Sequence, residues 1–330
     1  MKQEQFVTRY QHEWLQFENW LQQRGEHARK SAPALSSDLP GDETIPQRYR
    51  RLCQQFALAQ QRGYSPQLVE HLQQLMQRGH NLMYRTPRPR WQRAVEFLFA
   101  DFPLAVRSQA AAMWVSCALF AVPLIGIFVL LQVKPEMVHL LLDQAQITQM
   151  EKMYAPAADD LGRSSGTDWA MFGHYIMNNI SIGLRTFASG LLAGIGTILV
   201  LVFNGITIGA VAGHLQHAGF GPQFWRFVVG HAPFELTAIV IAGGAGLQLG
   251  LRLLAPGQQR RIDALVEGGR IGARLCLGVA FMLLVAAFIE AFWSSIAVVP
   301  MWGKLTVSIV LWLLVLGWLW RGGRGSSHAH

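Results

Sequence analysis

Residues 110 to 133 form one apolar run, AAAMWVSCALFAVPLIGIFVLLQV, that contains no Asp, Glu, Lys, Arg or His. An α-helix needs about 20 consecutive apolar residues to cross the hydrocarbon core of a bilayer, so this run is long enough. A helix that is apolar on every face is buried, either in a large protein core or in a membrane. We therefore predict that residues 110 to 133 form a first transmembrane helix.

The composition of the whole chain favours the same class of protein. Hydrophobic residues make up 51% of the 330 residues and charged residues only 15%, against about 25% in an ordinary soluble domain. The first 109 residues carry 15 of the 28 Lys and Arg residues, so a polar head precedes an apolar body. This excludes a soluble Rossmann enzyme, a collagenous or repeat protein, a disordered chain and a disulfide-rich secreted module. The net charge of +8 fits the basic cytoplasmic segments of membrane proteins, and no nucleic-acid partner is expected.

The head, residues 1 to 109, is expected to be a cytoplasmic domain of amphipathic helices. Apolar side chains recur at three- and four-residue steps within residues 6 to 24, 47 to 62 and 65 to 84, which is the pattern of one-sided helices. Residues 31 to 46 are rich in Pro, Ser and Asp and are expected to be a loop or linker. The polar start of the chain lacks the apolar core of a signal peptide, so we expect the head to stay in the cytoplasm.

The end of the head allows two interpretations. Trp91, Val95, Leu98 and Phe99 line one face of a helix in which several arginines supply positive charge. Such a helix can lie in the plane of the lipid headgroups, with its arginines on anionic lipid. The same apolar stripe could instead pack on the other helices of the head.

Further apolar stretches predict an all-α, polytopic helical membrane protein with about six transmembrane helices. We expect the transmembrane bundle at residues 110 to 320, with spans at about 110–133, 170–188, 191–213, 227–251, 272–294 and 303–320. The stretch at 170–188 includes His174, Asn178, Asn179 and Arg185, so a re-entrant segment is the alternative there.

The distribution of charge predicts the orientation. The connection 252–274 carries five arginines against two acids, and the tail 321–330 adds two arginines, so both are expected in the cytoplasm with the head. The stretch 134–169 carries six acids against three bases and is expected outside. A chain that starts and ends in the cytoplasm crosses an even number of times, which favours six spans.

Glycines recur at about four-residue intervals in the expected spans, and this spacing lets helix backbones approach closely. The series includes Gly190, Gly194 and Gly196, then Gly205, Gly209 and Gly213, and later Gly243, Gly244, Gly246 and Gly250. We expect tightly packed helices.

The candidate functional residues are ionisable groups inside apolar segments. His231 and Glu235 are four residues apart and share one helix face, and Glu290 lies towards the end of the fifth expected span. In the expected topology all three lie in the outer half of the membrane and can meet. An ionised carboxylate in hydrocarbon costs several kcal/mol, so each acid must be protonated, paired or beside water.

Amide side chains in the same apolar region complete the candidate set, which is His231, Glu235, Glu290, Asn178, Asn179 and Asn204. These groups could bind a proton, an ion, or the headgroup or sugar of a substrate. They could equally fasten helices together by hydrogen bonds worth about 1 kcal/mol each.

Signatures of catalysis are weak. The segment HAPFE at 231–235 departs from the HExxH of zinc proteases, because it has one histidine and no neighbouring general base. A GxSxG match falls only in the polar stretch 162–166, and the sequence has no Walker loop. The three cysteines show no CxxC spacing. We therefore expect no catalytic residue, no metal and no cofactor.

Four polar segments occur in a distinctive order, and they are MNNISIG (Asn178, Asn179), FNGITIG (Asn204, Gly205), GHAPFELTAIVIAGGAGL (His231, Glu235) and AAFIEAF (Glu290). With FPLAVR ahead of the first span, they resemble the stage II sporulation protein M family over about residues 90 to 320. The resemblance implies a multi-pass protein of the bacterial cytoplasmic (inner) membrane. It also implies peptidoglycan-remodelling partners, as in spore formers, where the named member anchors a lytic transglycosylase and an amidase. Other members occur beside MoxR-type ATPases and von Willebrand-type domain proteins.

The expected function is a non-enzymatic membrane scaffold or anchor whose head and acidic outer loop recruit envelope-remodelling partners or a MoxR-type ATPase system. The alternative is a permease or flippase in which His231, Glu235 and Glu290 bind a proton, an ion or a headgroup. Its support is the glycine-interrupted, asparagine-containing pair of spans around residues 171 to 213. Membrane lipids are expected around the spans, and small-residue packing also fits a homodimer.

Overall fold

The computed structural model describes residues 1–27, 45–83, 90–155, 168–296 and 298–324. The described residues are helical and contain no strand, which confirms the expected all-α class. The chain divides into two compact units at Gln92 and Arg93, whereas the expected head extends to residue 109. Most of the expected linker at 31–46 and the end of the tail fall outside the described residues.

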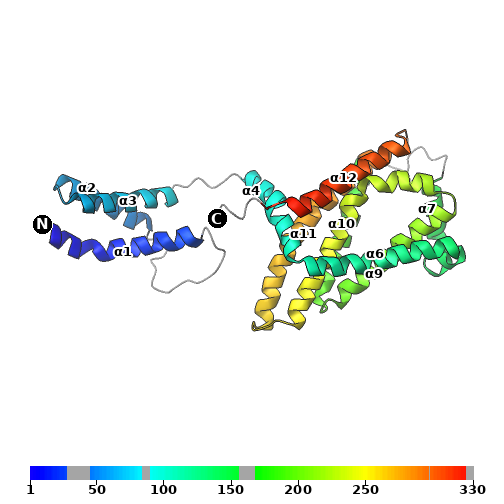
Figure 1. Ribbon diagram of the computed structural model, residues 1–330, viewed down its shortest axis with the longest axis horizontal. Coiled ribbons are helices and arrows are strands. Elements are labelled where there is room, and N and C mark those ends of the chain that lie inside the picture. The colour runs from blue at the N-terminus through cyan, green and yellow to red at the C-terminus, as the bar shows by residue number, and fades with distance from the viewer. Residues whose placement is uncertain (28–44, 84–89, 156–167, 297, 325–330) are drawn as a thin grey trace. The chain divides into compact units, whose positions relative to one another are not determined.

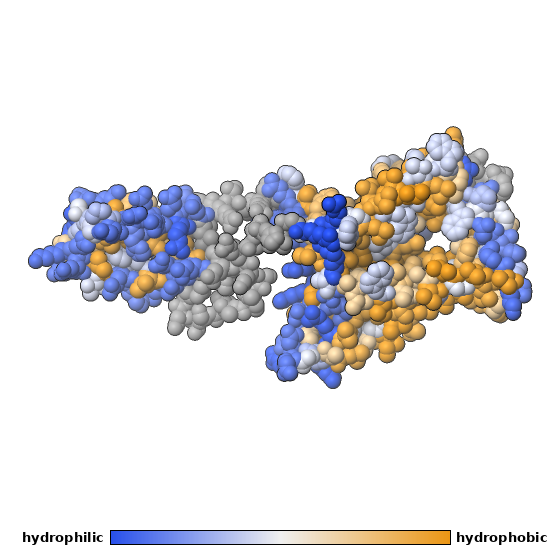
Figure 2. All heavy atoms as spheres, viewed as in Figure 1, coloured by the Kyte–Doolittle hydropathy of each residue, from blue (hydrophilic) through white to orange (hydrophobic). Residues whose placement is uncertain are grey.

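The N-terminal unit is built from α1 (Gln3–His27), α2 (Ile45–Gln61) and α3 (Pro66–Met83), as the apolar stripes predict. Gly63 follows α2 with a φ of +62°. Glycine adopts this left-handed conformation without the steric strain that a Cβ causes, and it commonly ends helices. The buried side chains on the facing stripes form one hydrophobic core, which consists of Phe6, Trp14, Phe17, Trp20, Leu21, Ile45, Leu52, Ala59, Leu72 and Leu75. This unit therefore has a core of its own beneath a hydrophilic surface (Figure 2).

The C-terminal unit begins with short helices and continues with long ones (Figure 1). The short ones are α4 (Arg90–Glu96), which crosses the unit boundary, a π-helical turn (Phe97–Asp101) and α5 (Phe102–Ser108). The remaining helices are α6 (Ala110–Val133), α7 (Gln144–Met153), α8 (Asp168–Ala188), α9 (Ile195–His217), α10 (Gly221–Leu254), α11 (Arg261–Ile289) and α12 (Met301–Arg321). Short 3-10 turns (Pro135–Leu140, Ser189–Leu191) and a second π-helical turn (Glu290–Ser294) complete the unit.

Five helices in the described part of the chain are long and apolar enough to cross a membrane. They are Ala110–Val133, Ile195–His217, Gly221–Leu254, Arg261–Ser294 and Met301–Arg321. The fold is thus a polytopic helical membrane protein, as expected. The sixth expected span is the more polar α8, a continuous helix of 21 residues that extends over about 30 Å, the thickness of a hydrocarbon core.

The direction of α9 shows in which direction α8 runs through the bundle. Gly205 faces the backbone of Phe120, and Gly213, further along α9, faces Leu131, further along α6. The two helices therefore run parallel. Because α6 and α9 point the same way, the chain must return to its starting end between them, and α8 is the long helix of that return. Within the described residues, the chain accordingly passes along the bundle six times, in α6, α8, α9, α10, α11 and α12.

Glycines bring the backbones of neighbouring helices into contact, as their spacing predicts. A Cβ on Gly190 would collide with the backbone of Gly246, and one on Gly250 would collide with the backbone of Gly194. Any residue type other than glycine would add a Cβ and would push the backbone of α10 away from the segment that leads into α9.

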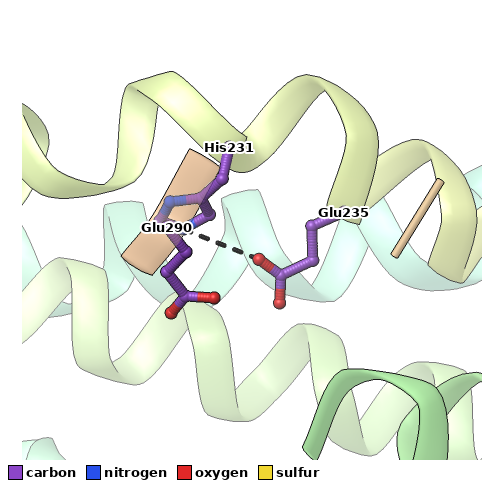
Figure 3. Close-up of side chains that lie close together, drawn as sticks. All are labelled: His231, Glu235 and Glu290. Carbon is purple, nitrogen blue, oxygen red and sulfur yellow. Dashed lines mark ion pairs between the residues drawn. The ribbon is translucent and has the colours of Figure 1, made fainter. Parts of the chain in front are cut away.

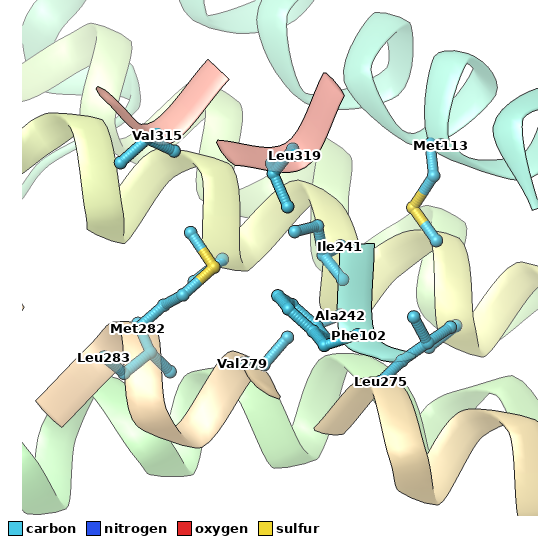
Figure 4. Close-up of a cluster of buried hydrophobic side chains, with 12 residues drawn as sticks. Phe102, Met113, Ile241, Ala242, Leu275, Val279, Met282, Leu283, Val315 and Leu319 are labelled. Carbon is cyan, nitrogen blue, oxygen red and sulfur yellow. The ribbon is translucent and has the colours of Figure 1, made fainter. Parts of the chain in front are cut away.

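The main hydrophobic core of this unit lies between α5, α10, α11 and α12 (Figure 4). Phe102 is fully buried, 5.4 Å from the ring of Trp318 between centroids, and its ring fills the space that Gly278 leaves open. α5 is therefore docked on the bundle. Val95 and Phe99, just before it, expose about half of their surface or more.

The face of the bundle that Figure 2 shows is largely apolar between polar ends. The connection between α10 and α11 lies at one end and α7 at the other (Figure 1). Large exposed apolar side chains on the helices between them include Val122, Ile125, Leu199, Phe203, Phe281 and Leu313. Such a continuous apolar surface is stable in lipid and not in water.

Candidate intramembrane polar site

Two of the candidate side chains project from one face of α10. His231 and Glu235 are one helical turn apart, and their Nε2 and Oε2 atoms are 3.6 Å from each other. His231 is buried, with 6% of its side chain exposed, and Glu235 is 20% exposed. Pro233 lies between them in the helix, and a proline there removes one backbone hydrogen bond of the helix.

Glu290 reaches the same place from the next helix. It begins the π-helical turn at the end of α11, and such turns are rare and often occur at functional sites. The π turn contacts α10 at Gly230, where an added Cβ would lie 3.2 Å from Ser294 Oγ. One ligand atom from each of His231, Glu235 and Glu290 lies within 4.8 Å of the other two, and Figure 3 shows the three side chains converging.

α8 contributes the amide groups. Asn179 Nδ2 donates to Glu290 Oε2 at 3.4 Å, and Asn178 Nδ2 donates to Asn179 Oδ1 at 3.1 Å. Asn204 instead donates to the carbonyl of Val200 in its own helix at 2.8 Å. Of the six candidate residues, the structure therefore brings five together through contacts and leaves Asn204 on α9.

Two neighbours of the site were not expected from the sequence. His231 Nδ1 lies 3.0 Å from Ser294 Oγ in the π turn, and Lys304 Nζ donates to the backbone carbonyl of Ser294 at 2.6 Å. Lys304, near the start of α12, is fully buried. A lone lysine at the beginning of an apolar span was the signal available in the sequence for this residue. Ser294 offered no such signal, because its position depends on the π turn.

Aromatic side chains cover the cluster on the side where α7 ends. The Phe227 ring packs edge-on at 5.3 Å from that of His231, and Tyr154, which follows α7, packs edge-on against Phe227 and Phe224. Burial raises the pKa of Tyr154 well above its ordinary value, and the negative charges of Glu290 and Glu235 raise it further. Tyr154 thus lies close enough to the acids to experience their field.

The charges of the cluster define what it can do. Two carboxylates are held together with one imidazole, two amides and one hydroxyl, and the ammonium group of Lys304 lies on the far side of Ser294. Two carboxylates this close in a poorly polarisable medium repel each other strongly unless a proton or a cation lies between them. The arrangement can therefore hold a proton, a cation or the positive group of a ligand, or it can fasten α8, α10 and α11 together.

A helical bundle with an apolar belt and a polar cluster between its spans defines a multi-pass α-helical membrane protein. The family model described as Stage II sporulation protein M matches residues 110–295, more than half of the chain, and the protein belongs to this family. This confirms the resemblance seen in the sequence. A second model, described as Domain of unknown function (DUF8413), matches residues 4–85, the region of α1 to α3. Searches of curated proteins and of solved structures gave no match.

Proposed function

We propose that this protein is a non-enzymatic scaffold of the bacterial inner membrane, which anchors partners that remodel peptidoglycan or the envelope. The observation that supports it best is the division of the chain. A compact helical unit with its own core and a hydrophilic surface is joined to a membrane-embedded unit. Such a unit is suited to binding partner proteins, among which a MoxR-type ATPase system is one candidate, and a homodimer would double the number of binding surfaces.

The orientation proposed for the scaffold follows from its charges. Arginines gather at the end of the bundle where α10 and α11 are connected and α12 ends, and they include Arg252, Arg260, Arg261, Arg321 and Arg324. A basic end favours the cytoplasmic side of a membrane. Both termini would then be cytoplasmic, and the region around α7 would face the peptidoglycan.

Substitutions in the full-length chain, expressed in the source bacterium, test the scaffold. Leu72 is fully buried in the N-terminal core, so Leu72→Asp is expected to unfold that unit. Cross-linking to envelope partners and rescue of a deletion strain should both be lost, while Leu15→Asp, at a site that is 56% exposed, should retain both. Normal rescue by Leu72→Asp, with the N-terminal unit shown by proteolysis to be unfolded, would contradict the scaffold.

A permease or flippase is the second candidate, and the convergence of His231, Glu235 and Glu290 favours it. Such a protein would use the acids to bind a proton, an ion or a headgroup between the helices. The two functions respond differently to a Glu235→Gln, Glu290→Gln double variant that keeps the shape of both side chains. A scaffold retains cross-linking and rescue in that variant, whereas a permease loses rescue and loses lipid or solute movement in proteoliposomes.

A further inference from the structure

We propose that His231, Glu235 and Glu290 form a binding site for a divalent transition-metal ion of the zinc class inside the membrane unit. The inference goes beyond the anchoring function. It rests on four features of the site: the number and type of ligands, their spacing, the orientation of the imidazole and the balance of charge.

The ligand set is suited to such an ion. One imidazole nitrogen and two carboxylate oxygens from three separate side chains lie within 4.8 Å of one another. Zinc binds histidine nitrogen and carboxylate oxygen at about 2.0 to 2.2 Å, which places neighbouring ligand atoms about 3.4 Å apart in a tetrahedron. The His231 Nε2 to Glu235 Oε2 distance of 3.6 Å is already close to that value. The third ligand atom, from Glu290, lies within 4.8 Å of the other two.

The imidazole of His231 is held in the orientation that a metal ligand needs. Its Nδ1 lies 3.0 Å from Ser294 Oγ, so an Nδ1–H donated to that hydroxyl leaves the lone pair of Nε2 directed at the two acids. Metal-binding histidines commonly donate their second nitrogen to such a partner, which fixes the ring and its tautomer. The carbonyl of Ser294 accepts from Lys304 Nζ at 2.6 Å. The lysine thereby holds the π turn in place.

The charges of the three ligands balance when a divalent ion is bound. Two ionised carboxylates and a neutral imidazole carry a charge of −2, which a divalent cation cancels, while the ammonium group of Lys304 lies further out, at the backbone carbonyl of Ser294. A neutral site costs far less in a bilayer than two adjacent carboxylates. Among the described residues, the only hydrogen bond to either carboxylate comes from Asn179 Nδ2, at 3.4 Å from Glu290 Oε2. Three protein ligands also leave a fourth position open for water or a ligand, as in catalytic and transport sites.

Zinc titration of the full-length protein in detergent, after removal of metals with a chelator, tests the site. We expect one Zn²⁺ per chain in competition with a chromophoric chelator, and an increase in thermal unfolding temperature on binding. Glu235→Gln and Glu290→Gln should each weaken binding at least tenfold and abolish the thermal shift. Ser294→Ala, which removes only the positioning hydroxyl, should weaken binding about tenfold.

Glu151→Gln is the matched control. Glu151 lies 2.9 Å from His214, so it also forms a His–Glu pair, but the described residues place no second acid within metal-binding distance of it. This variant should bind Zn²⁺ as the natural protein does. Co²⁺ in place of Zn²⁺ should give the intense visible bands of a four-coordinate ion, which disappear in His231→Gln.

Three results would overturn the proposal. They are the absence of stoichiometric Zn²⁺ binding by the natural protein, unchanged binding in folded Glu290→Gln, and an equal loss in Glu151→Gln. Circular dichroism and size-exclusion chromatography establish the folded state of each variant. If one Gln variant fails to fold, the Ser294→Ala and His231→Gln variants decide the question, because unchanged Zn²⁺ affinity in both contradicts the site.

Discussion

At the scale of single residues, the membrane unit holds several polar side chains close together between its helices. His231 and Glu235 share a face because four residues make about one helical turn, and the sequence predicts this much. The meeting with Glu290 follows from the opposite directions of α10 and α11. The contact of Ser294 with His231 could not be predicted, because the π turn changes which side chains face α10.

Tyr154 offers a test of the buried surroundings beside the two acids. Because burial and the nearby carboxylates raise its pKa, its phenol should stay neutral at pH values where the phenols of exposed tyrosines ionise. Absorbance titration at 295 nm should therefore show no difference between the natural protein and Tyr154→Phe up to about pH 10, and a difference only above it.

The same shift links Tyr154 to stability. A raised pKa in the folded state stabilises the fold below the unfolded value of 10.0, and this stabilisation declines as the pH rises towards the folded value. The unfolding temperature of the natural protein should fall more steeply than that of Tyr154→Phe above pH 10. Identical slopes, or a phenol in Tyr154 that ionises at the usual pH, would contradict its burial beside the two acids.

At the scale of helices, packing depends on places where two backbones touch. Hydropathy predicts the five apolar spans, because the transfer of apolar side chains from water to lipid dominates their free energy. α8 is more polar, so its hydropathy alone does not identify it as a span. The parallel course of α6 and α9 in the structure shows that α8 returns through the bundle. The ends of the helices were also less predictable. α10 runs over Gly221–Leu254, beyond the expected 227–251, because it continues past the apolar region.

Gly246→Ala tests the close approach of α10 to the helices beside it. The new Cβ would meet the backbone oxygen of Thr186 at 2.8 Å and collide with Thr197, and overpacking of this kind destabilises a core by about 1–3 kcal/mol. We expect a lower unfolding temperature in detergent. Gly126→Ala on α6, where a Cβ meets nothing within 4 Å, should be neutral or slightly stabilising. Equal effects at both positions would contradict the packing.

At the scale of the whole molecule, six passes place the basic connection between α10 and α11 at one end and the region of α7 at the other (Figure 1). Charge counts predict the same separation from the sequence alone. The way in which the N-terminal unit is used could not be predicted in the same manner. The helical periodicity of its apolar residues predicts its core. The polar residues on its surface show no comparable periodicity from which a binding partner could be predicted.

Cysteine labelling of the full-length chain tests the orientation. Single cysteines at the exposed positions Gln144 and Gln258, in a chain without its natural cysteines, lie at opposite ends of the bundle. A membrane-impermeant maleimide added to spheroplasts should label Gln144→Cys at once and Gln258→Cys only after permeabilisation. Labelling of both positions from the same side would contradict the six-pass topology, and the reverse pattern would contradict the orientation alone.

The central claim is that His231, Glu235 and Glu290 form one shared centre between α10 and α11, and an experimental structure of the full-length protein in a lipid nanodisc tests it most directly. We predict that the imidazole and both carboxylates will be found together, with ligand atoms within about 5 Å of one another, as the 4.8 Å grouping requires. Glu235 and Glu290 directed to separate surfaces, each in contact with bulk water, would contradict the account.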